Sequence, residues 1–102
     1  MIKILLAEDH NVVRNGIRSF LEKEGDMEVI AEASNGKEAL QLIKDGNKPD
    51  IVLTGINMPQ MSGIELLIRV KQTYPTVKVV ILSILDQDKF ILQAFKAGAT
   101  QS

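Results

Sequence analysis

The sequence contains no cysteine, and this absence excludes several kinds of site at once. Without thiols there is no disulfide framework, no thiolate metal centre and no thiol nucleophile. A single histidine, His10, cannot build a metal site from several imidazoles. No apolar run approaches the roughly 20 residues that a membrane-spanning helix needs. These absences favour a cytoplasmic protein with no role at a membrane.

The chain also lacks a large excess of charge of either sign. Its 12 basic and 13 acidic residues leave a formal net charge of -1. This balance excludes a strongly basic nucleic-acid surface and an acidic solvating tail. At 102 residues the chain is long enough for one small globular domain, so we expect residues 1–102 to form a single unit.

Short apolar runs alternate with segments in which apolar residues recur at helical spacing. Ser34 to Gly36 forms a turn that can cap a helix, and Ser62 with Glu65 three residues later forms a capping-box pattern. The helix that Ser62 begins is expected to turn Ile64, Leu67 and Val70 or Lys71 to one side. The predicted strands and helices, in chain order, are Ile2–Ala7, Asn11–Glu24, Met27–Ala33, Lys37–Lys44, Ile51–Thr54, Gly63–Thr73, Val77–Leu82 and Gln87–Ala97.

The elements therefore repeat a strand–helix unit four times. Strands that are apolar on both faces and are joined by helices indicate a parallel sheet covered on both sides, a doubly wound α/β fold. In such folds the working site lies at the carboxyl ends of the strands. The segments to examine are then Glu8 to His10, Gly55 to Asn57, and Ser83 with the residue after it.

The residues at these strand ends leave several readings open. Glu8 and Asp9 suit a hard cation such as Mg²⁺, yet spacing alone favours one of them capping the first helix while the other is solvated. Ser83 could bond a ligand oxygen or its own backbone. His10 is more easily explained as a surface residue with a raised pKa than as a general base, because no nucleophile elbow accompanies it. No glycine-rich nucleotide loop is present.

Five separated motifs, in order, carry a resemblance to a known family: ILLAEDH, AEASNGKEAL, PDIVLTGINMPQMSGIEL, VKVVILS and AFKAGAT. Together they resemble the receiver domain of bacterial two-component response regulators. The resemblance spans the whole chain and is strongest to the subfamily whose receivers precede a LuxR-type DNA-binding domain. It implies the flavodoxin-like, CheY-like receiver fold, a histidine kinase as partner, and DNA contact only through a further C-terminal domain.

The resemblance also assigns roles to individual residues. Glu8 and Asp9 match the acids that bind Mg²⁺, and Asn57 matches the residue whose backbone carbonyl completes the metal site. Ser83 matches the hydroxyl residue that contacts the phosphoryl group and triggers switching. The position of the phosphoacceptor aspartate, at the end of the third strand, is occupied by Gly55.

Two departures from the family pattern change the expected function. Gly55 has no side chain, so no acyl phosphate can form there, and the loss of a ligand makes Mg²⁺ binding weak or absent. The chain ends at Ser102, before the family's fifth strand, its lysine and its last helix. We expect a receiver that relays signals without enzymatic turnover and cannot be phosphorylated. The alternative is a pseudo-receiver that acts by phosphorylation-independent dimerisation or interaction.

A third possibility, an unrelated small α/β enzyme of flavodoxin-like or phosphatase-like type, has little support. The sequence has no phosphate-cradling loop, and a phosphatase that uses an aspartate nucleophile would need it where Gly55 stands.

The fourth strand is expected to form an exposed, apolar sheet edge, because no fifth strand follows it in this sequence. Such edges pair readily with other chains. We predict that the 102-residue chain does not persist as a normal monomer, and that it dimerises through Val77–Leu82, exchanges elements between chains or is only partly folded. Light scattering on a size-exclusion column across a concentration series checks this, and a compact monomer at every concentration would contradict it.

Overall fold

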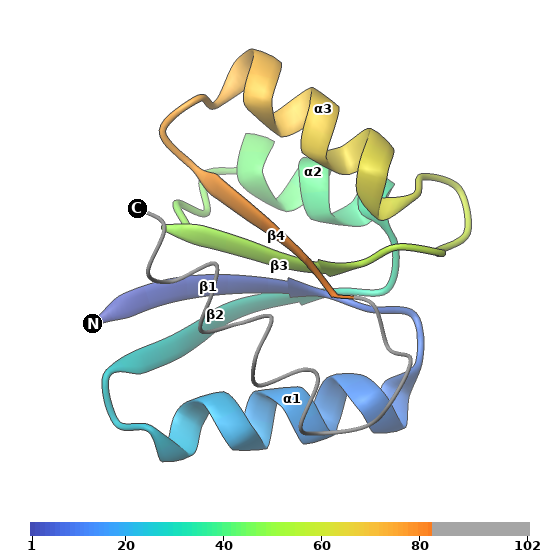
Figure 1. Ribbon diagram of the computed structural model, residues 1–102. Coiled ribbons are helices and arrows are strands. Elements are labelled where there is room, and N and C mark those ends of the chain that lie inside the picture. Colours follow the sequence, from blue (N-terminus) through green and yellow to red (C-terminus); the bar gives the residue numbers. More distant parts are fainter. Residues whose placement is uncertain (83–102) are drawn as a thin grey trace.

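The computed structural model describes residues 1–82, in which strands and helices alternate along the chain (Figure 1). Each boundary lies within one residue of its predicted position. The predicted helix Gln87–Ala97 and Ser83 lie outside the described residues. The elements are β1 (Ile2–Ala7), α1 (Asn11–Lys23), β2 (Met27–Ala33), α2 (Gly36–Lys44), β3 (Ile51–Gly55), α3 (Gly63–Thr73) and β4 (Lys78–Leu82).

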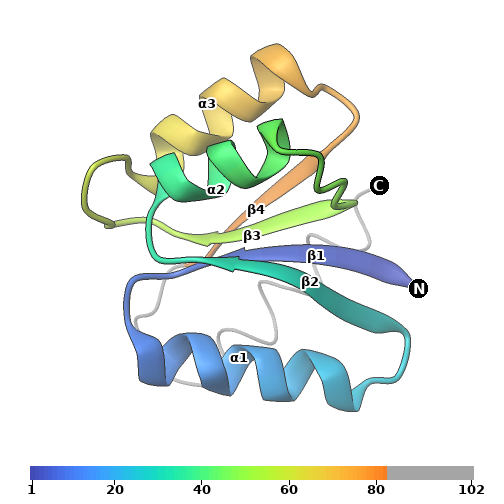
Figure 2. The same cartoon turned by 180° about the vertical axis from the view of Figure 1, so that it is seen from behind.

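The four strands form one parallel sheet in the order β2-β1-β3-β4. Helix α1 covers one face, and α2 and α3 cover the other (Figures 1 and 2). This arrangement confirms the predicted doubly wound α/β fold. None of the helices within residues 1–82 is both long and apolar enough to cross a membrane.

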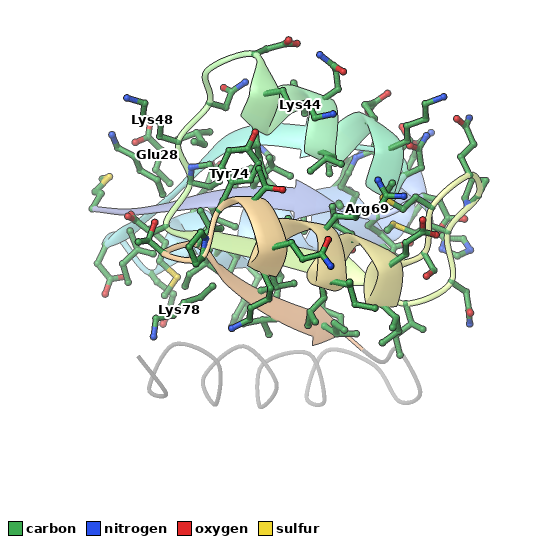
Figure 3. All side chains as sticks on the ribbon, turned by 90° about the horizontal axis from the view of Figure 1, so that it is seen from above. Glu28, Lys44, Lys48, Arg69, Tyr74 and Lys78 are labelled. Atoms are coloured by element: carbon green, nitrogen blue, oxygen red, sulfur yellow. The ribbon has the colours of Figure 1, made fainter. Side chains whose placement is uncertain are left out.

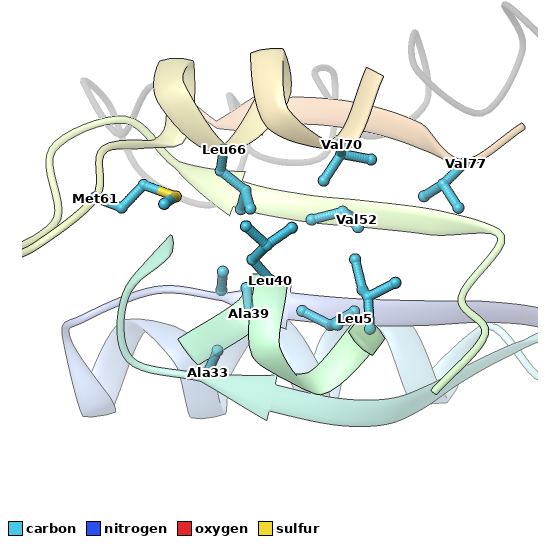
Figure 4. Close-up of a cluster of buried hydrophobic side chains, with 11 residues drawn as sticks. Leu5, Ala33, Ala39, Leu40, Val52, Met61, Leu66, Val70 and Val77 are labelled. Atoms are coloured by element: carbon cyan, nitrogen blue, oxygen red, sulfur yellow. The ribbon is translucent and has the colours of Figure 1, made fainter. Parts of the chain in front are cut away.

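Strand β1 is the centre of the core because its side chains alternate between two apolar clusters. Ile4 and Leu6 point to the α1 side, where they join Ile17 and Leu21. The cluster on the other face, shown in Figure 4, contains Leu5, Ala7, Ala33, Ala39, Leu40, Ile43, Val52, Met61, Leu66, Val70 and Val77. Because both faces are covered, the strands carry almost continuous apolar sequence, which is the pattern typical of parallel sheets.

Polar side chains begin α2 and α3 as their sequences predicted. Asn35 caps α2 by accepting a hydrogen bond from the Glu38 backbone N–H at 2.8 Å. Ser62 caps α3 in the same way, with the Glu65 N–H at 3.2 Å. Tyr74 ends α3 and packs against the edge of the core cluster on that face (Figure 3). These caps satisfy backbone donors that the helix itself leaves free.

Helix α3 turns a different face inwards from the one that its spacing suggested. Leu66 and Val70 are fully buried, whereas Ile64 is 48% exposed. Leu67 is only half-buried and Lys71 is exposed. Of the residues predicted to share one side of this helix, Val70 is buried against the sheet, whereas Ile64 and Lys71 are exposed.

Gly63 accounts for the rotation of α3. It is buried at the first position of the helix, and its backbone N–H donates to the Ile56 carbonyl at 2.8 Å. A Cβ atom at this position would collide with the Gly55 carbonyl oxygen. The helix therefore rests directly on the end of β3, and this contact fixes which of its side chains meet the sheet.

Two glycine substitutions test this contact. Gly63→Ala should destabilise the fold by roughly 1–3 kcal/mol, because the added methyl group meets rigid backbone. Gly16 in α1 is exposed and has open space where a Cβ would stand, so Gly16→Ala should stabilise by about 0.5–1 kcal/mol. Urea unfolding followed by circular dichroism measures both. Equal effects of the two substitutions would contradict the close-packing explanation.

Candidate functional site

The candidate site forms where β1 and β3 end side by side. The parallel register pairs Ala7 with Thr54, so the next residues, Glu8 and Gly55, meet at the carboxyl edge of the sheet. Glu8 is 2% exposed, which is unusual for a carboxylate. A buried charge of this kind needs partners close by.

His10 supplies those partners to one oxygen of the Glu8 carboxylate. The His10 backbone N–H donates to Glu8 Oε2 at 2.9 Å, and His10 Nδ1 lies 2.7 Å from the same atom. The other oxygen, Oε1, points towards β3. An ideal Cβ on Gly55 would lie only 2.7 Å from it. The Glu8 carboxylate thus occupies the space in which a side chain at position 55 would begin.

Asp9 carries a carboxylate oxygen whose needs are not met within residues 1–82. Asp9 Oδ1 is buried and accepts no hydrogen bond there. His10 Nδ1 lies 3.1 Å away, which is close enough for an ion pair. Ligand atoms of Glu8, Asp9 and His10 all lie within 4.8 Å of one another. Two carboxylates, one with a buried oxygen that accepts no hydrogen bond within residues 1–82, form a donor set that suits a hard cation such as Mg²⁺.

Neither acid caps the first helix, although the sequence alone favoured that role. The N-cap of α1 is His10, and its side chain makes no capping hydrogen bond. Glu8 instead turns back to bind His10, and Asp9 lies beside it. The capping interpretation is therefore wrong, because His10 occupies the N-cap position and both acids precede it.

Arg14 is the residue at this edge that the sequence did not single out. Its Nη1 donates to the Glu8 backbone carbonyl at 2.7 Å, and its Nη2 donates to Asn11 Oδ1, also at 2.7 Å. Its Nε pairs with Glu32 Oε1 at 3.2 Å. The available signal was slight, because an arginine in the first turns of an amphipathic helix is ordinarily a solvated residue.

The residues at the end of β3 and in the loop after it differ in how far they are exposed to solvent. Thr54 is fully buried, and its hydroxyl donates to the Gly55 carbonyl at 3.0 Å. Asn57 lies exposed in the following loop. Gly55 pairs with Leu82 on β4, and Ser83 lies outside the described residues. Glu8, Asp9 and Gly55 therefore meet at one edge.

The acid pair raises the pKa of His10 above its usual value of 6.5. The largest cause is the hydrogen bond to Glu8, followed by the charges of Asp9 and Glu8, while desolvation opposes them slightly. Because the pKa is higher in the folded state, protonated His10 stabilises the fold below pH 6.5. That contribution disappears as the pH rises through the folded pKa.

Comparison with known proteins agrees with this geometry. The family described as response regulator receiver domain matches residues 4–102. The chain belongs to this family. Its receivers are signalling domains that generally bind Mg²⁺ at their acidic site, and regulators of this kind work with histidine kinases and, through output domains, with DNA.

The most similar relatives are transcriptional regulators. The chain is 39% identical over 98 residues to the uncharacterized transcriptional regulatory protein YhcZ of Bacillus subtilis, covering 96% of this chain and 45% of that protein. It is 38% identical over 97 residues to the response regulator VraR of Staphylococcus aureus, covering 95% and 46%. The chain thus spans less than half the length of these relatives.

Solved structures show the same fold. The signal receiver domain of the putative response regulator NarL from Mycobacterium tuberculosis aligns with a TM-score of 0.76 at 29% identity, covering 93% of this chain and 76% of that one. A LuxR-family response regulator from Staphylococcus aureus also aligns at 0.76, with 28% identity and coverages of 96% and 80%. These likenesses confirm the receiver fold that the sequence motifs implied.

The contact between His10 and Glu8 can be measured directly because His10 is the sole histidine. Glu8→Gln should lower the pKa of His10 towards its ordinary value, since the hydrogen bond to Glu8 is the largest cause of the shift. The matched control is Glu65→Gln on α3, which removes a carboxylate away from the site. NMR titration of the imidazole ring gives both values. A pKa that is unchanged by Glu8→Gln would contradict the geometry.

Proposed function

We propose that this chain is the receiver domain of a two-component transcriptional response regulator in which Gly55 prevents phosphorylation. The observation that carries the proposal is the edge formed by Glu8, Asp9 and Gly55. Two acids stand at the end of β1, and the neighbouring end of β3 offers no side chain. The regulator relatives and the receiver structures support the signalling part of the proposal.

The chemistry that Gly55 removes is the formation of an acyl phosphate. A carboxylate oxygen must attack the phosphorus of the donor, form a new P–O bond and expel the donor's leaving group. Two other oxygen nucleophiles at this edge, the Thr54 hydroxyl and the Glu8 carboxylate, are poorly placed for this attack. Thr54 is fully buried and its hydroxyl is engaged, while the Glu8 side chain is 3% exposed and held by His10. We propose no replacement acceptor among residues 1–82.

Mg²⁺ would be held by Glu8, Asp9 and the backbone carbonyl of Asn57. The buried Oδ1 of Asp9 supports this assignment, because it accepts no hydrogen bond within residues 1–82 and a cation could bind to it. When bound, Mg²⁺ supplies positive charge that offsets the acids and an incoming phosphoryl group. With Gly55 in place of an acid, the protein offers one carboxylate fewer, so binding is expected to be weak. Ser83 is proposed to contact the phosphoryl group in a version that carries the acceptor.

The proposed partners follow from the relatives and not from a surface of this chain. A histidine kinase would be the phosphoryl donor of a version with an intact acceptor. DNA would be contacted by a separate domain, since the regulators that resemble this chain are about twice as long. The net charge of -1 agrees with a receiver that does not itself bind DNA.

The alternative is a phosphorylation-independent interaction module. Within residues 1–82, β4 forms one edge of the sheet, and its residues Val79 and Val80 are only half-buried. An apolar edge of this kind can pair with a strand of another chain. Under this alternative the chain would signal without a phosphoacceptor, because its function would depend on association alone.

Restoring the acid tests the proposal. In a chain extended by the family's fifth strand and last helix, Gly55→Asp should gain one phosphoryl group from acetyl phosphate with Mg²⁺, measured by mass spectrometry, whereas the unaltered chain should gain none. Gly55→Asn is the matched control, because it displaces the Glu8 carboxylate equally but has no nucleophilic oxygen.

The possible outcomes separate clearly. A phosphoryl adduct on the unaltered chain would reveal another acceptor and overturn the proposed incompetence. If Gly55→Asp folds but gains no phosphoryl group, this edge is not the receiver site proposed. Hydroxylamine should remove an adduct carried on Asp but not one carried on a hydroxyl group, which identifies the acceptor chemically.

A further inference from the structure

We propose that Arg14 is a positioning residue, whose guanidinium holds the β1–α1 turn so that Glu8 and Asp9 stay arranged for a cation. The inference rests on the proposed Mg²⁺ site and concerns how this chain keeps that site formed. It assigns no contact between Arg14 and the cation. Arg14 acts through the backbone of Glu8 and the side chain of Asn11.

The contacts of Arg14 bracket the turn. Nη1 donates to the carbonyl of Glu8, the first residue of the turn, at 2.7 Å. Nη2 donates at 2.7 Å to the side chain of Asn11, the first residue of α1. Asp9 and His10 lie between these two points. The planar guanidinium thus hydrogen-bonds to both ends of a short segment. These bonds restrict the backbone that carries Glu8 and Asp9.

The same guanidinium is itself anchored on the neighbouring strand. Its Nε lies 3.2 Å from Glu32 Oε1 in β2, and Arg18 Nη1 donates to the other oxygen of Glu32 at 2.7 Å. The Arg14 side chain is 17% exposed and that of Glu32 is 25%. The pair is therefore better shielded from solvent than the Glu65–Arg69 pair of α3, whose side chains are about half exposed.

The turn needs such an anchor because of the charges it carries. Glu8 is buried, and Asp9 has a buried oxygen without a hydrogen bond within residues 1–82. Two neighbouring carboxylates repel each other, and relaxation of the backbone would move Asp9 out to solvent. His10 contacts both carboxylates, but it lies within the turn and its side chain makes no capping hydrogen bond to α1. Arg14 is the group whose contacts span the turn and oppose that relaxation.

Substitution of Arg14 separates positioning from simple electrostatics. Arg14→Lys keeps the charge but loses the planar fork, and Arg14→Gln loses both. If Arg14 positions the acids, both variants should raise the Mg²⁺ dissociation constant by about tenfold, as removal of groups that orient metal ligands typically does. If Arg14 acts only through its charge, Arg14→Gln should bind Mg²⁺ more tightly and Arg14→Lys should be unchanged.

The matched control is Arg18→Gln. Arg18 lies one turn further along α1, and its ion pairs within residues 1–82 are with Glu22 and the same Glu32, not with the residues of the turn. Its substitution should leave the dissociation constant unchanged even if the thermal midpoint falls. Binding is read from the amide NMR shifts of Asp9 and His10 during titration with Mg²⁺ alone, and circular dichroism checks that each variant is folded.

Each result of the Mg²⁺ titrations either supports or overturns the positioning role of Arg14. Weaker binding by both Arg14 variants, with Arg18→Gln unaffected, supports the positioning role, and Arg14→Lys decides alone if Arg14→Gln does not fold. Unchanged or tighter binding by a folded Arg14→Lys overturns it. Equal weakening by Arg18→Gln also overturns it, since general destabilisation of α1 would then suffice. No Mg²⁺ binding by the unaltered chain overturns the proposed metal site and this inference with it.

Discussion

The parallel pairing of β1 with β3 determines the chemistry of this chain, because it brings the Glu8 carboxylate against the backbone of Gly55. The next layer depends on the same place, since Gly63 at the start of α3 rests on the Gly55 carbonyl. A strand end, an acid and a helix start thus share one small volume. Because the atoms here are closely packed, a larger side chain at position 55 would displace Glu8 and could also shift the start of α3 at Gly63.

Burying acids at this edge is costly, and the surrounding residues offset the cost unequally. Glu8 receives two contacts from His10, and its carbonyl receives one from Arg14. Asp9 receives only an ion-pair contact from His10. The Glu8 carboxylate is therefore hydrogen-bonded, whereas Asp9 Oδ1 accepts no hydrogen bond within residues 1–82. Such an imbalance is unfavourable in a purely structural turn and is typical of a site built to hold a charged ligand.

Much of the fold could be predicted because it follows from local patterns. Strands buried on both faces read as apolar runs, and Asn35 and Ser62 mark helix starts. The sequence also placed Glu8 and Gly55 at the carboxyl ends of β1 and β3, and the register of these strands brings the two residues together. The sequence could not predict which face of α3 points to the sheet or where the Arg14 side chain reaches, because tertiary contacts decide both. The rotation of α3 depends on backbone touching backbone at Gly63, and the reach of Arg14 to two ends of a turn depends on where Glu32 holds it.

Gly55 affects the position of Glu8 as well as the proposed phosphoryl chemistry, because a Cβ at position 55 would lie 2.7 Å from Glu8 Oε1. With glycine at this position, Glu8 Oε1 can settle where a Cβ would stand and let its other oxygen bind His10. An aspartate there would push the Glu8 carboxylate aside by contact and, in the absence of a cation, repel it by charge. Glycine at position 55 therefore relieves crowding at this edge, because Glu8 has no carboxylate beside it on β3. Under the proposed function, the same residue would prevent acyl-phosphate formation and leave Mg²⁺ with one carboxylate ligand fewer.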